Sequence, residues 1–458
     1  MTERFEIVEK ALLKMLEEKK YSALRDLLLV MNPSDIAQLF LQVQERSIPL
    51  LFRLLPKELA AESFVEMDPD TQELLIRSFS DNELKEIVDE LYVDDAADLV
   101  EEMPANVVKR ILKQADPEMR RSINQILRYP ENSAGSWMTT EYVSLRPDMT
   151  VGEAILRIRR QGVDKETIYT CYVTQGRVLQ GIVTVKELLL AEDDDVLISD
   201  IMSTNLICVT THTDQEEVAR MFSHYNFLAL PVVDGENRMV GIVTFDDAMD
   251  VMEEETTEDM ELMGGMTPSE KSYLKSSAVE LFKNRIPWLM LLMVSATFTG
   301  LIITAFEGAL AAQVALTAFI PMLMGTGGNS GSQSSVTVIR ALSLDELTFA
   351  DVWKVLWKEL RTALMCGIAL AVVCFVKIWL VDRLLFGNTQ ITWLVDLVVC
   401  LALCVTVVVA KVVGCLLPIG AKAIKLDPAV MASPFISTIV DALSLLVYFL
   451  FAKMLLGV

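Results

Sequence analysis

Two of the aspartates in the apolar C-terminal part of the chain, Asp427 and Asp441, have a spacing that indicates a chemical role. Asp441 lies in the segment PFISTIVDALSLLVYFLF, and Asp427 precedes it by 14 residues. An ionised carboxylate that faces lipid costs at least a few kcal/mol, so Asp441 is expected to face a bundle interior or a water-filled path. Helical spacing puts Thr438 and Asp441 on one face. In an unbroken helix, Asp427 would lie within about 40° of that face and about 21 Å lower, although Pro434 would bend the helix.

These acids offer oxygen ligands, with almost no nitrogen or sulfur alternatives nearby. The chain has two histidines, His212 and His224, and both lie in the N-terminal half. A His-rich transition-metal site among the apolar segments is therefore excluded, and hard cations remain. Mg²⁺ sheds water reluctantly and is usually held by one or two carboxylates while it keeps much of its hydration shell. The other interpretation of Asp441 is a structural ion pair with Lys377 or Lys411.

A polar, glycine-rich stretch, GTGGNSGSQSS from Gly325 to Ser335, interrupts the second apolar segment. It is too polar to face lipid, so it must be buried in protein or line a wet cavity. A break in the helix here would expose backbone carbonyls that suit a hydrated divalent ion. The alternative is close helix packing at small residues.

The elements that position these residues are apolar runs long enough to cross a bilayer, since about 20 residues suffice. Five spans are predicted: Ile286–Phe306, Ala309–Ile339, Thr362–Phe386, Ile391–Leu417 and Ala429–Leu456. The loops assigned to the cytosol carry most of the basic residues: Arg340, Lys354, Lys358, Arg361, Lys422 and Lys425, against Arg383 in an outer loop. This bias predicts a multi-pass protein in lipid, with cytosolic N-terminal domains and the C-terminus outside.

Charge divides the 458-residue chain sharply. Residues 1–267 hold 52 acidic and 26 basic side chains, a net charge of −26, whereas residues 268–458 hold 11 and 14, a net of +3, which together give −23. No cluster of Lys and Arg stands out that would release counterions from nucleic acid, so nucleic acid is excluded as a partner.

The acids of the N-terminal half crowd onto two predicted helices: Asp94, Asp95 and Asp98 on one, and Asp246, Asp247, Asp250, Glu253, Glu254, Glu255, Glu258 and Asp259 on the other. A charge run is often only a solvated face. A domain this acidic also repels itself unless cations screen it, so it is poised to close when divalent ions bind. The second run leads along the chain toward the first span.

The N-terminal half has two kinds of pattern. Residues 1–130 show short helices with Pro beside Asp, Asn or Ser at their starts, which predicts an α-superhelix or a helical bundle. Beyond them, β-branched runs alternate with helices, and GIVTVKELL at residue 181 recurs as GIVTFDDAM at 241, a spacing of 60. This α/β repeat resembles a pair of CBS modules.

The segments PMLMGTGGNSGSQSSVTVIRAL from Pro321 to Leu342 and LDPAVMASPFISTIVDALSLLVYF from Leu426 to Phe449 resemble the MgtE family of magnesium channels and transporters. The resemblance covers the whole chain. It implies a multidomain fold: an acidic helical N-domain at 1–130, CBS modules at 131–200 and 201–256, a connecting helix at 257–285, and a five-helix transmembrane pore domain at 286–458.

The resemblance also implies roles for particular residues. The family is homodimeric, and its pore lies on the two-fold axis between the second and fifth spans. Its pore acid falls on Asp441, its cytosolic Asp-Pro-Ala on Asp427, and its Gly-Gly-Asn on Gly327 to Asn329. In CBS modules a T-x-x-D at the start of the last helix can bind adenosine nucleotides. Here Thr244 and Asp247 fit this pattern, while the first copy ends in Glu187, so ATP binding is a possible further property.

The predicted function is a Mg²⁺-selective channel or transporter for magnesium uptake, gated by cytosolic Mg²⁺ on the acidic N and CBS domains. One alternative is an ion-coupled secondary transporter of divalent cations such as Co²⁺ or Mn²⁺, in which Asp441 and Lys377 would act as relays. A membrane-anchored enzyme or nucleotide sensor lacks support, because the chain shows no P-loop, no nucleophile elbow and no histidine placed for acid–base chemistry.

Overall fold

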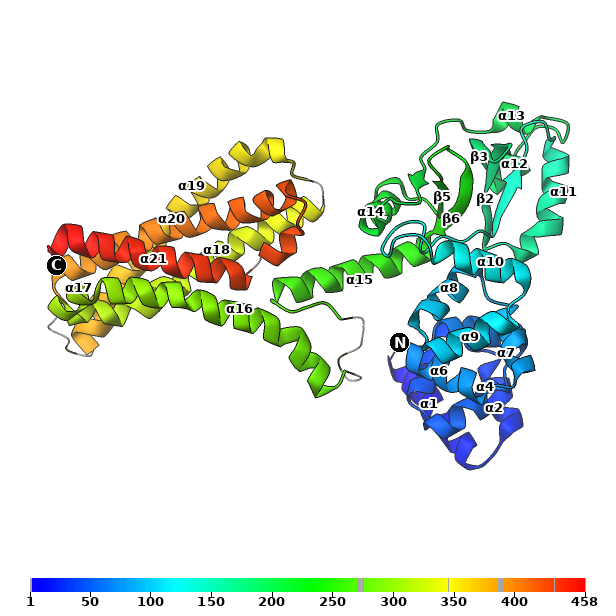
Figure 1. The fold of residues 1–458 in the computed structure, drawn as a ribbon, viewed down its shortest axis with the longest axis horizontal. Helices are drawn as coiled ribbons and strands as arrows, with labels where there is room; N and C mark the ends of the chain where they lie inside the picture. Colours follow the sequence, from blue (N-terminus) through cyan, green and yellow to red (C-terminus); the bar gives the residue numbers. More distant parts are fainter. Residues whose placement is uncertain are drawn as a thin grey trace. The chain divides into compact units, whose positions relative to one another are not determined.

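The computed structural model describes residues 2–269, 273, 276–344, 346–385, 387, 391–431 and 433–457. It forms two compact units, Met1–Met252 and Glu253–Val458 (Figure 1). Each unit has its own buried core.

The first half of unit 1 is built from short helices, as the sequence predicts. Their bounds are α1 Thr2–Glu17, α2 Tyr21–Leu28, α3 Pro33–Leu41, η1 Glu45–Ser47, α4 Ile48–Phe52, α5 Lys57–Val65, α6 Pro69–Ser78, α7 Asp81–Val88, α8 Val93–Glu102, α9 Ala105–Gln114 and α10 Pro117–Ile126. The Pro-Asp breaks are helix starts: the carboxylates of Asp68 and Asp116 accept the N–H groups of Thr71 and Met119. These caps satisfy backbone donors that a helix start leaves free.

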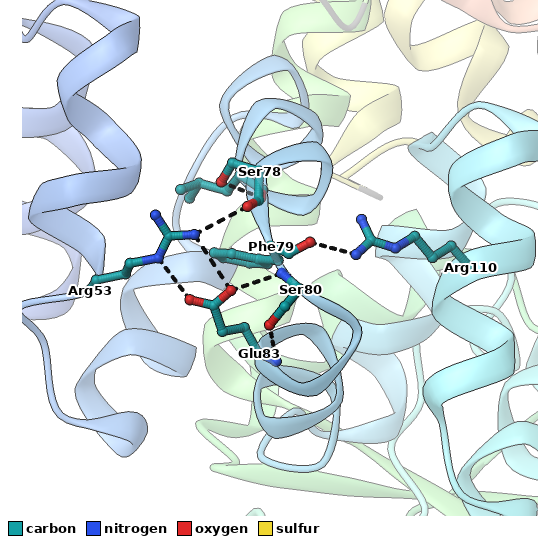
Figure 2. A network of polar contacts seen from close by, with 7 residues as sticks. Arg53, Ser78, Phe79, Ser80, Glu83 and Arg110 are labelled. Carbon is teal, nitrogen blue, oxygen red and sulfur yellow. Dashed lines mark hydrogen bonds and ion pairs between the residues drawn. The ribbon is translucent and has the colours of Figure 1, made fainter.

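Polar contacts join helices of this domain that are not consecutive in the sequence (Figure 2). Arg53 donates from Nε to Glu83 Oε1 over 2.7 Å, and Glu83 also closes a capping box with Ser80 at the start of α7. Arg110 of α9 donates to the carbonyl of Phe79 between α6 and α7. The hydrogen bond from Arg53, followed by that from the Ser80 N–H, lowers the pKa of Glu83 to about 2. Hydrogen bonds thereby connect the end of α4, the start of α7 and α9 to the turn between α6 and α7.

The rest of unit 1 forms two similar α/β modules. The first contains β1 Tyr142–Leu145, α11 Val151–Gln161, η2 Gly162–Asp164, β2 Thr167–Gln175, β3 Val178–Thr184, α12 Val185–Leu189 and α13 Ile198–Ile201. The second contains β4 Val209–Thr210, α14 Gln215–Tyr225, β5 Ala229–Val233, β6 Met239–Thr244 and the start of α15 Phe245–Met263. Each sheet has one parallel and one antiparallel strand pair, in the orders β1-β2-β3 and β4-β5-β6. The repeat seen in the sequence is therefore a repeat of folded units.

The two modules share one core. Tyr172 and Leu179 from the first sheet pack with Ala229, Val233 and Ile242 from the second. Backbone bridges also join Ile182 to Ser203 and Val178 to Arg238. The two modules are therefore packed against each other, and Glu141 of the first accepts a hydrogen bond from the Val93 N–H of α8.

Unit 2 is helical. Beyond the end of α15 its elements are α16 Ala278–Ala305, α17 Glu307–Ala312, η3 Val314–Phe319, α18 Ile320–Ser343, η4 Phe349–Asp351, α19 Val352–Lys377, η5 Ile378–Leu385, α20 Trp393–Ala423, η6 Pro428–Met431 and α21 Ser433–Leu456. Within the described ranges, four helical segments are long and apolar enough to cross a membrane. The fifth predicted span, α18, reaches about 36 Å with its 24 residues but is more polar, and it packs against α20 and α21.

Several predicted boundaries were wrong. The second span begins at Ile320 instead of Ala309, because α17 and η3 turn the chain before it. The third begins at Val352, ten residues before the predicted Thr362. The predicted connecting helix 257–285 is not one helix: α15 starts at Phe245 and ends at Met263, and α16 starts at Ala278.

Candidate cation pathway and cation sensor

Asp441 lies on α21 and is half-buried within unit 2. Among the described residues, it has no hydrogen bond and no ion pair. Thr438, one turn earlier, donates its hydroxyl to the carbonyl of Pro434 over 3.1 Å. An ionisable group in a membrane segment without a protein partner is the kind expected to meet an ion or water.

The lysines that could have neutralised Asp441 are engaged elsewhere. Lys377 Nζ lies 2.8 Å from Asp382 Oδ2, and Lys411 Nζ lies 3.3 Å from Ser334 Oγ. Ser334 in turn donates to Glu359 Oε2 over 2.6 Å. The structural ion pair considered as the alternative for Asp441 is therefore not formed.

The glycine-rich stretch is not a helix break, and this part of the prediction was wrong. Gly325–Ser335 is continuous helix within α18, and the Gly328 carbonyl accepts the Ser332 hydroxyl inside that helix. The glycines serve close packing: a Cβ at Gly327 would lie 2.7 Å from Ser444 Oγ, and one at Gly331 2.8 Å from Ile436 Cγ2. The backbone carbonyls here are used within the helix and are not open to an ion.

This packing brings the stretch beside Asp441. Gly328 contacts Ser437, one turn before Asp441, and Gly327 contacts Ser444, nearly one turn after it. Asn329, adjacent to Gly328, is exposed on α18. Gly327 and Gly328 of α18 thus lie at the level of Asp441 on α21.

Asp427 does not continue the helix that carries Asp441. It precedes the 3₁₀ turn η6, its carboxylate accepts the Ala429 N–H over 2.7 Å, and α21 begins only at Ser433. The predicted single helical face from Asp427 to Asp441 was therefore wrong. The turn instead brings Asp427 to other carboxylates.

Those carboxylates come from α15, within the same unit. Burial, followed by repulsion from Asp427, raises the pKa of Asp259 to about 6. Burial and repulsion from Glu255 and Asp427 also raise the pKa of Glu258. Glu254, on the same helix, is exposed. The end of α15 packs Leu262 and Met263 on Ile339 of α18 and Ala429 of η6, so the acids lie close to these two elements.

A second group of acids gathers in unit 1, where α8 meets the CBS pair. Burial, followed by repulsion from Asp95, raises the pKa of Asp94 well above its usual range. Burial and repulsion from Asp247 raise the pKa of Asp95 to about 7. Asp98 also has a raised pKa because of burial and its acidic neighbours, although its side chain keeps contact with solvent. Asp247, at the start of α15, therefore lies close to the acids of α8 within unit 1.

Two members of this group were missed by the sequence analysis. Burial, then repulsion from Asp95 and Asp247, raises the pKa of Glu166 to about 8. Glu141 accepts hydrogen bonds from the Val93 N–H and the Thr139 hydroxyl. Each is a single acid beside a strand, so no run or spacing in the sequence marks it.

Two oxygens in this group are buried without a hydrogen-bond partner, Asp94 Oδ1 and Glu166 Oε2. Buried oxygens without a hydrogen-bond partner are unusual, and they are typical of sites that bind a ligand or an ordered water molecule. In the described part of the chain, no three Asp, Glu, His or Cys side chains are close enough to hold one metal ion directly. The arrangement suits an ion that keeps its water shell between itself and the carboxylates, as Mg²⁺ does.

Three acids at the start of α15, Asp246, Asp247 and Asp250, differ in surroundings. Asp246 and Asp250 are exposed at the start of α15, and both repel the carboxylate of Asp247. Burial is the main cause that raises the pKa of Asp247 to about 6, while its hydrogen bond from Thr244 opposes the shift. Thr244 is buried and pairs with Asp247 instead of facing an open cavity.

A cavity of about 500 Å³ lies at the other copy of the repeat. Its lining includes Tyr169, Thr184, Lys186, Leu189 and Leu228. Aromatic and apolar walls with one cationic side chain suit a nucleotide. The predicted nucleotide residues Thr244 and Asp247 do not line it.

Comparisons with known proteins agree with this layout. A model of the MgtE family described as "Divalent cation transporter" matches residues 320–451, the "MgtE intracellular N domain" matches 31–132, and CBS domains match 134–194 and 198–254. A protein named magnesium transporter MgtE from Thermus thermophilus is 36% identical over 453 residues, covering 97% of this chain and 98% of that protein. One of the same name from Bacillus subtilis is 31% identical, covering 95% and 94%.

Two solved structures resemble unit 1. The cytosolic domain of the Mg²⁺ channel MgtE in complex with ATP is 38% identical, with a TM-score of 0.51, and the match covers 53% of this chain and 99% of that one. The soluble part of a magnesium transporter is 30% identical, with a TM-score of 0.51, covering 55% and 99%. Modules, order and length all correspond, and the chain therefore belongs to the MgtE family of divalent cation transporters.

Proposed function

We propose that this protein is a Mg²⁺-selective channel for magnesium uptake. The observation that carries the proposal is Asp441, a half-buried carboxylate on α21 that no lysine of the described chain neutralises. A carboxylate beside the polar α18 attracts a small doubly charged ion that keeps its water. The family consists of transporters, not enzymes, and both relatives described above are named magnesium transporters.

The pore is proposed to form between two copies of the chain, with Asp441 of each copy on the two-fold axis. In one copy, no described residue of α16 is buried, although the helix is 28 residues long. Asn329 and Asp441 also keep exposed surface. A second subunit would pair the two Asp441 carboxylates, and lipid would cover the rest of the apolar surface.

Cytosolic Mg²⁺ is proposed to close the pore by bridging acids in each unit. In unit 1 the ion would lie among Asp94, Asp95, Asp98, Asp247 and Glu166, where carboxylates with raised pKa values and orphan oxygens are gathered. Mg²⁺ would bind the compact, closed form more tightly than the open form. This difference in affinity, and not charge screening alone, would shift the equilibrium toward the closed pore.

In unit 2 the bridging ion would lie among Glu255, Glu258, Asp259 and Asp427. It would hold the end of α15 against α18 and η6, where Leu262 and Met263 already pack. When internal Mg²⁺ falls, repulsion among these four acids would release the pore helices.

A nucleotide is proposed to bind in the cavity at the first CBS repeat. The adenine ring would lie between the Tyr169 and Leu228 side chains, and Lys186 would meet phosphate. The related cytosolic domain solved with ATP supports a nucleotide in this family. The N-terminal domains would lie in the cytosol and the C-terminus outside, as the basic loops indicate.

The direct test is Mg²⁺ uptake by Mg²⁺-starved cells that express Asp441→Asn or Asp441→Ala. Both variants should lose uptake, since either removes the charge that attracts the ion. Asp396→Asn is the matched control, because Asp396 is another buried intramembrane carboxylate but lies in the α20 core beside Cys400. Wild-type flux through both Asp441 variants would remove the pore assignment.

A further inference from the structure

Unit 1 contains a basic concavity, although acids outnumber bases in residues 1–267 by 52 to 26. It measures about 750 Å³, and its wall contains donors but no carboxylate: Arg120, Arg121, Asn124, Gln125, Arg128, Tyr129 and His212. None of these residues lines the cavity at the first CBS repeat. The surface is therefore separate from both the cation sensor and the proposed nucleotide cavity.

One helix supplies most of this wall. Residues 120, 124 and 128 repeat every four positions, and 121 and 125 form the neighbouring row, so the five side chains share the outer face of α10 and its last turn. The inner face of the same helix packs Met119, Ile126 and Leu127 on α8. The three arginines lie within nine residues of the sequence, but only the helical spacing of α10 and the approach of His212 bring these side chains to one concavity.

The opposite wall is an aromatic pair held by the second CBS module. The rings of Tyr129 and His212 meet edge to face with centroids 6.4 Å apart. The Thr211 hydroxyl lies 3.0 Å from His212 Nδ1, and Tyr129 packs against the module's core. The wall is thus fixed to the CBS fold.

Two of the three arginines make no polar contact with other side chains of the described chain. Arg120 donates to the carbonyls of Lys113 and Ala115, but within the described chain Arg121 and Arg128 have neither an ion pair nor a side-chain hydrogen bond. Many carboxylates of this half could have paired with them. Guanidinium groups that remain unpaired and converge on one hollow are suited to an external anion, and their planar forks fit phosphate oxygens.

We propose that this concavity binds a phosphate-bearing small anion, with Arg121 and Arg128 holding the phosphate chain and Arg120 completing the charge. The volume lies in the range of small-molecule sites. The Tyr129 and His212 rings provide a surface against which a nucleoside would stack, so inorganic polyphosphate and nucleoside triphosphate share the required chemistry.

The test is calorimetric titration of the full-length protein in detergent with inorganic tripolyphosphate, in Mg²⁺-free buffer and with Mg²⁺ in excess. The wild type should bind in at least one buffer. Arg121→Gln with Arg128→Gln should weaken binding at least about tenfold, since each lost charge-assisted hydrogen bond accounts for roughly such a factor. Arg159→Gln with Arg160→Gln, the same charge change at exposed positions on α11, should bind as the wild type does.

Further titrations distinguish inorganic polyphosphate from a nucleotide as the ligand. In a Lys186→Gln background, which impairs the CBS cavity, equal affinity for ATP and tripolyphosphate would identify the phosphate chain as the recognised group. Tighter binding of ATP that His212→Ala abolishes would identify a nucleotide. Thermal unfolding of each variant checks that it is folded.

Four results would overturn the proposal. The first is that the wild type binds no tripolyphosphate in either buffer, and the second is that the Arg121/Arg128 variant keeps the wild-type affinity. The third is that the Arg159/Arg160 control loses as much affinity as that variant. The fourth is that Arg121 and Arg128 capture anionic phospholipid vesicles while the protein does not bind the soluble anion. The last would assign the surface to a membrane.

Discussion

At the scale of single residues, the pathway depends on which charges are compensated inside the protein. Lys411 is 5% exposed and would be costly as an isolated ammonium. Ser334 connects it to Glu359, so the positive charge on α20 is balanced by a negative one on α19 through a hydroxyl of α18. Asp441 has no such balance among the described residues and remains available for a cation.

The first prediction concerns this network. Glu359→Gln should lower the free energy of unfolding by about 1–3 kcal/mol, because it leaves a buried ammonium without its counter-charge. Removing both charges, with Glu359→Gln and Lys411→Met, should restore most of the loss. Thermal unfolding of the purified protein in detergent measures both, and a double variant as unstable as Glu359→Gln would contradict the coupling.

A second prediction at this scale follows from the acids of unit 1. Asp247, Asp95 and Glu166 have pKa values of about 6, 7 and 8 in the folded protein, against about 4 in an unfolded chain. The folded state therefore holds protons that the unfolded state has lost. The stability that this contributes is present in full below about pH 4 and is lost as the pH rises through 6 to 8.

The measurement is the thermal unfolding midpoint of the full chain without Mg²⁺ at several pH values. The midpoint should fall between pH 6 and pH 8, and Mg²⁺ should remove most of the fall by taking the place of the protons. Asp95→Asn should flatten the pH dependence. A midpoint that stays constant without Mg²⁺ would speak against repulsion in the cluster.

At the scale of elements, the packing of α18 explains its unusual composition. Its glycines let the helix approach α20 and α21 so closely that a Cβ at Gly414 of α20 would lie 2.2 Å from the Gly331 carbonyl oxygen. The buried face of α18 carries serines as well as glycines, since Ser330, Ser334 and Ser335 are buried, whereas Asn329 is exposed. Close packing of α18 therefore leaves part of the polar stretch at the surface of the subunit.

The matching prediction compares two glycines of α18. Gly327→Ala should destabilise the protein by about 1–3 kcal/mol, since the new methyl group would meet Ser444, Thr406 and Val440 at 3.0 Å or less. Gly325→Ala is the control, because nothing lies within 4 Å of its Cβ position and alanine favours a helix. Equal unfolding midpoints for the two variants would contradict the packing described for α18.

At the scale of the whole molecule, one helix, α15, runs from the second CBS module into unit 2. Residues of α15 belong first to the second CBS module, through Ala248 and Val251, and finally to unit 2, through Leu262 and Met263. This helix contributes Asp247 to the first group of acids and Glu255, Glu258 and Asp259 to the second. The sequence predicted an acidic route toward the first span, and the folded helix ends instead at α18 and η6.

The prediction at this scale is that deletion of residues 1–267 leaves Mg²⁺ conduction intact but abolishes block by internal Mg²⁺. The pore residues lie outside the deleted segment, whereas the acids of α8 and α15 lie within it. Patch recordings with Mg²⁺ varied on the cytosolic side measure both properties. A truncated protein still blocked by internal Mg²⁺ would refute gating through these acids.

Much of this protein is determined by local sequence. The apolar runs, the acid runs, the 60-residue repeat and the scarcity of histidine are properties of contiguous segments, and they predicted the modules, four of the membrane helices and hard-cation chemistry. The helix starts in the N-terminal domain were predictable for the same reason, since Asp68 and Asp116 cap the residues that directly follow them.

The contacts between segments that are distant in the sequence were decided only by the tertiary structure. Whether Gly325–Ser335 is a break or a packed helix depends on α20 and α21. Glu166 joins Asp95 only because a strand end meets α8, and Lys411 finds Ser334 across 77 positions. The sequence determines which charged residues are present. Which of them become partners depends on their separation in space, and the packing of the folded chain sets that separation.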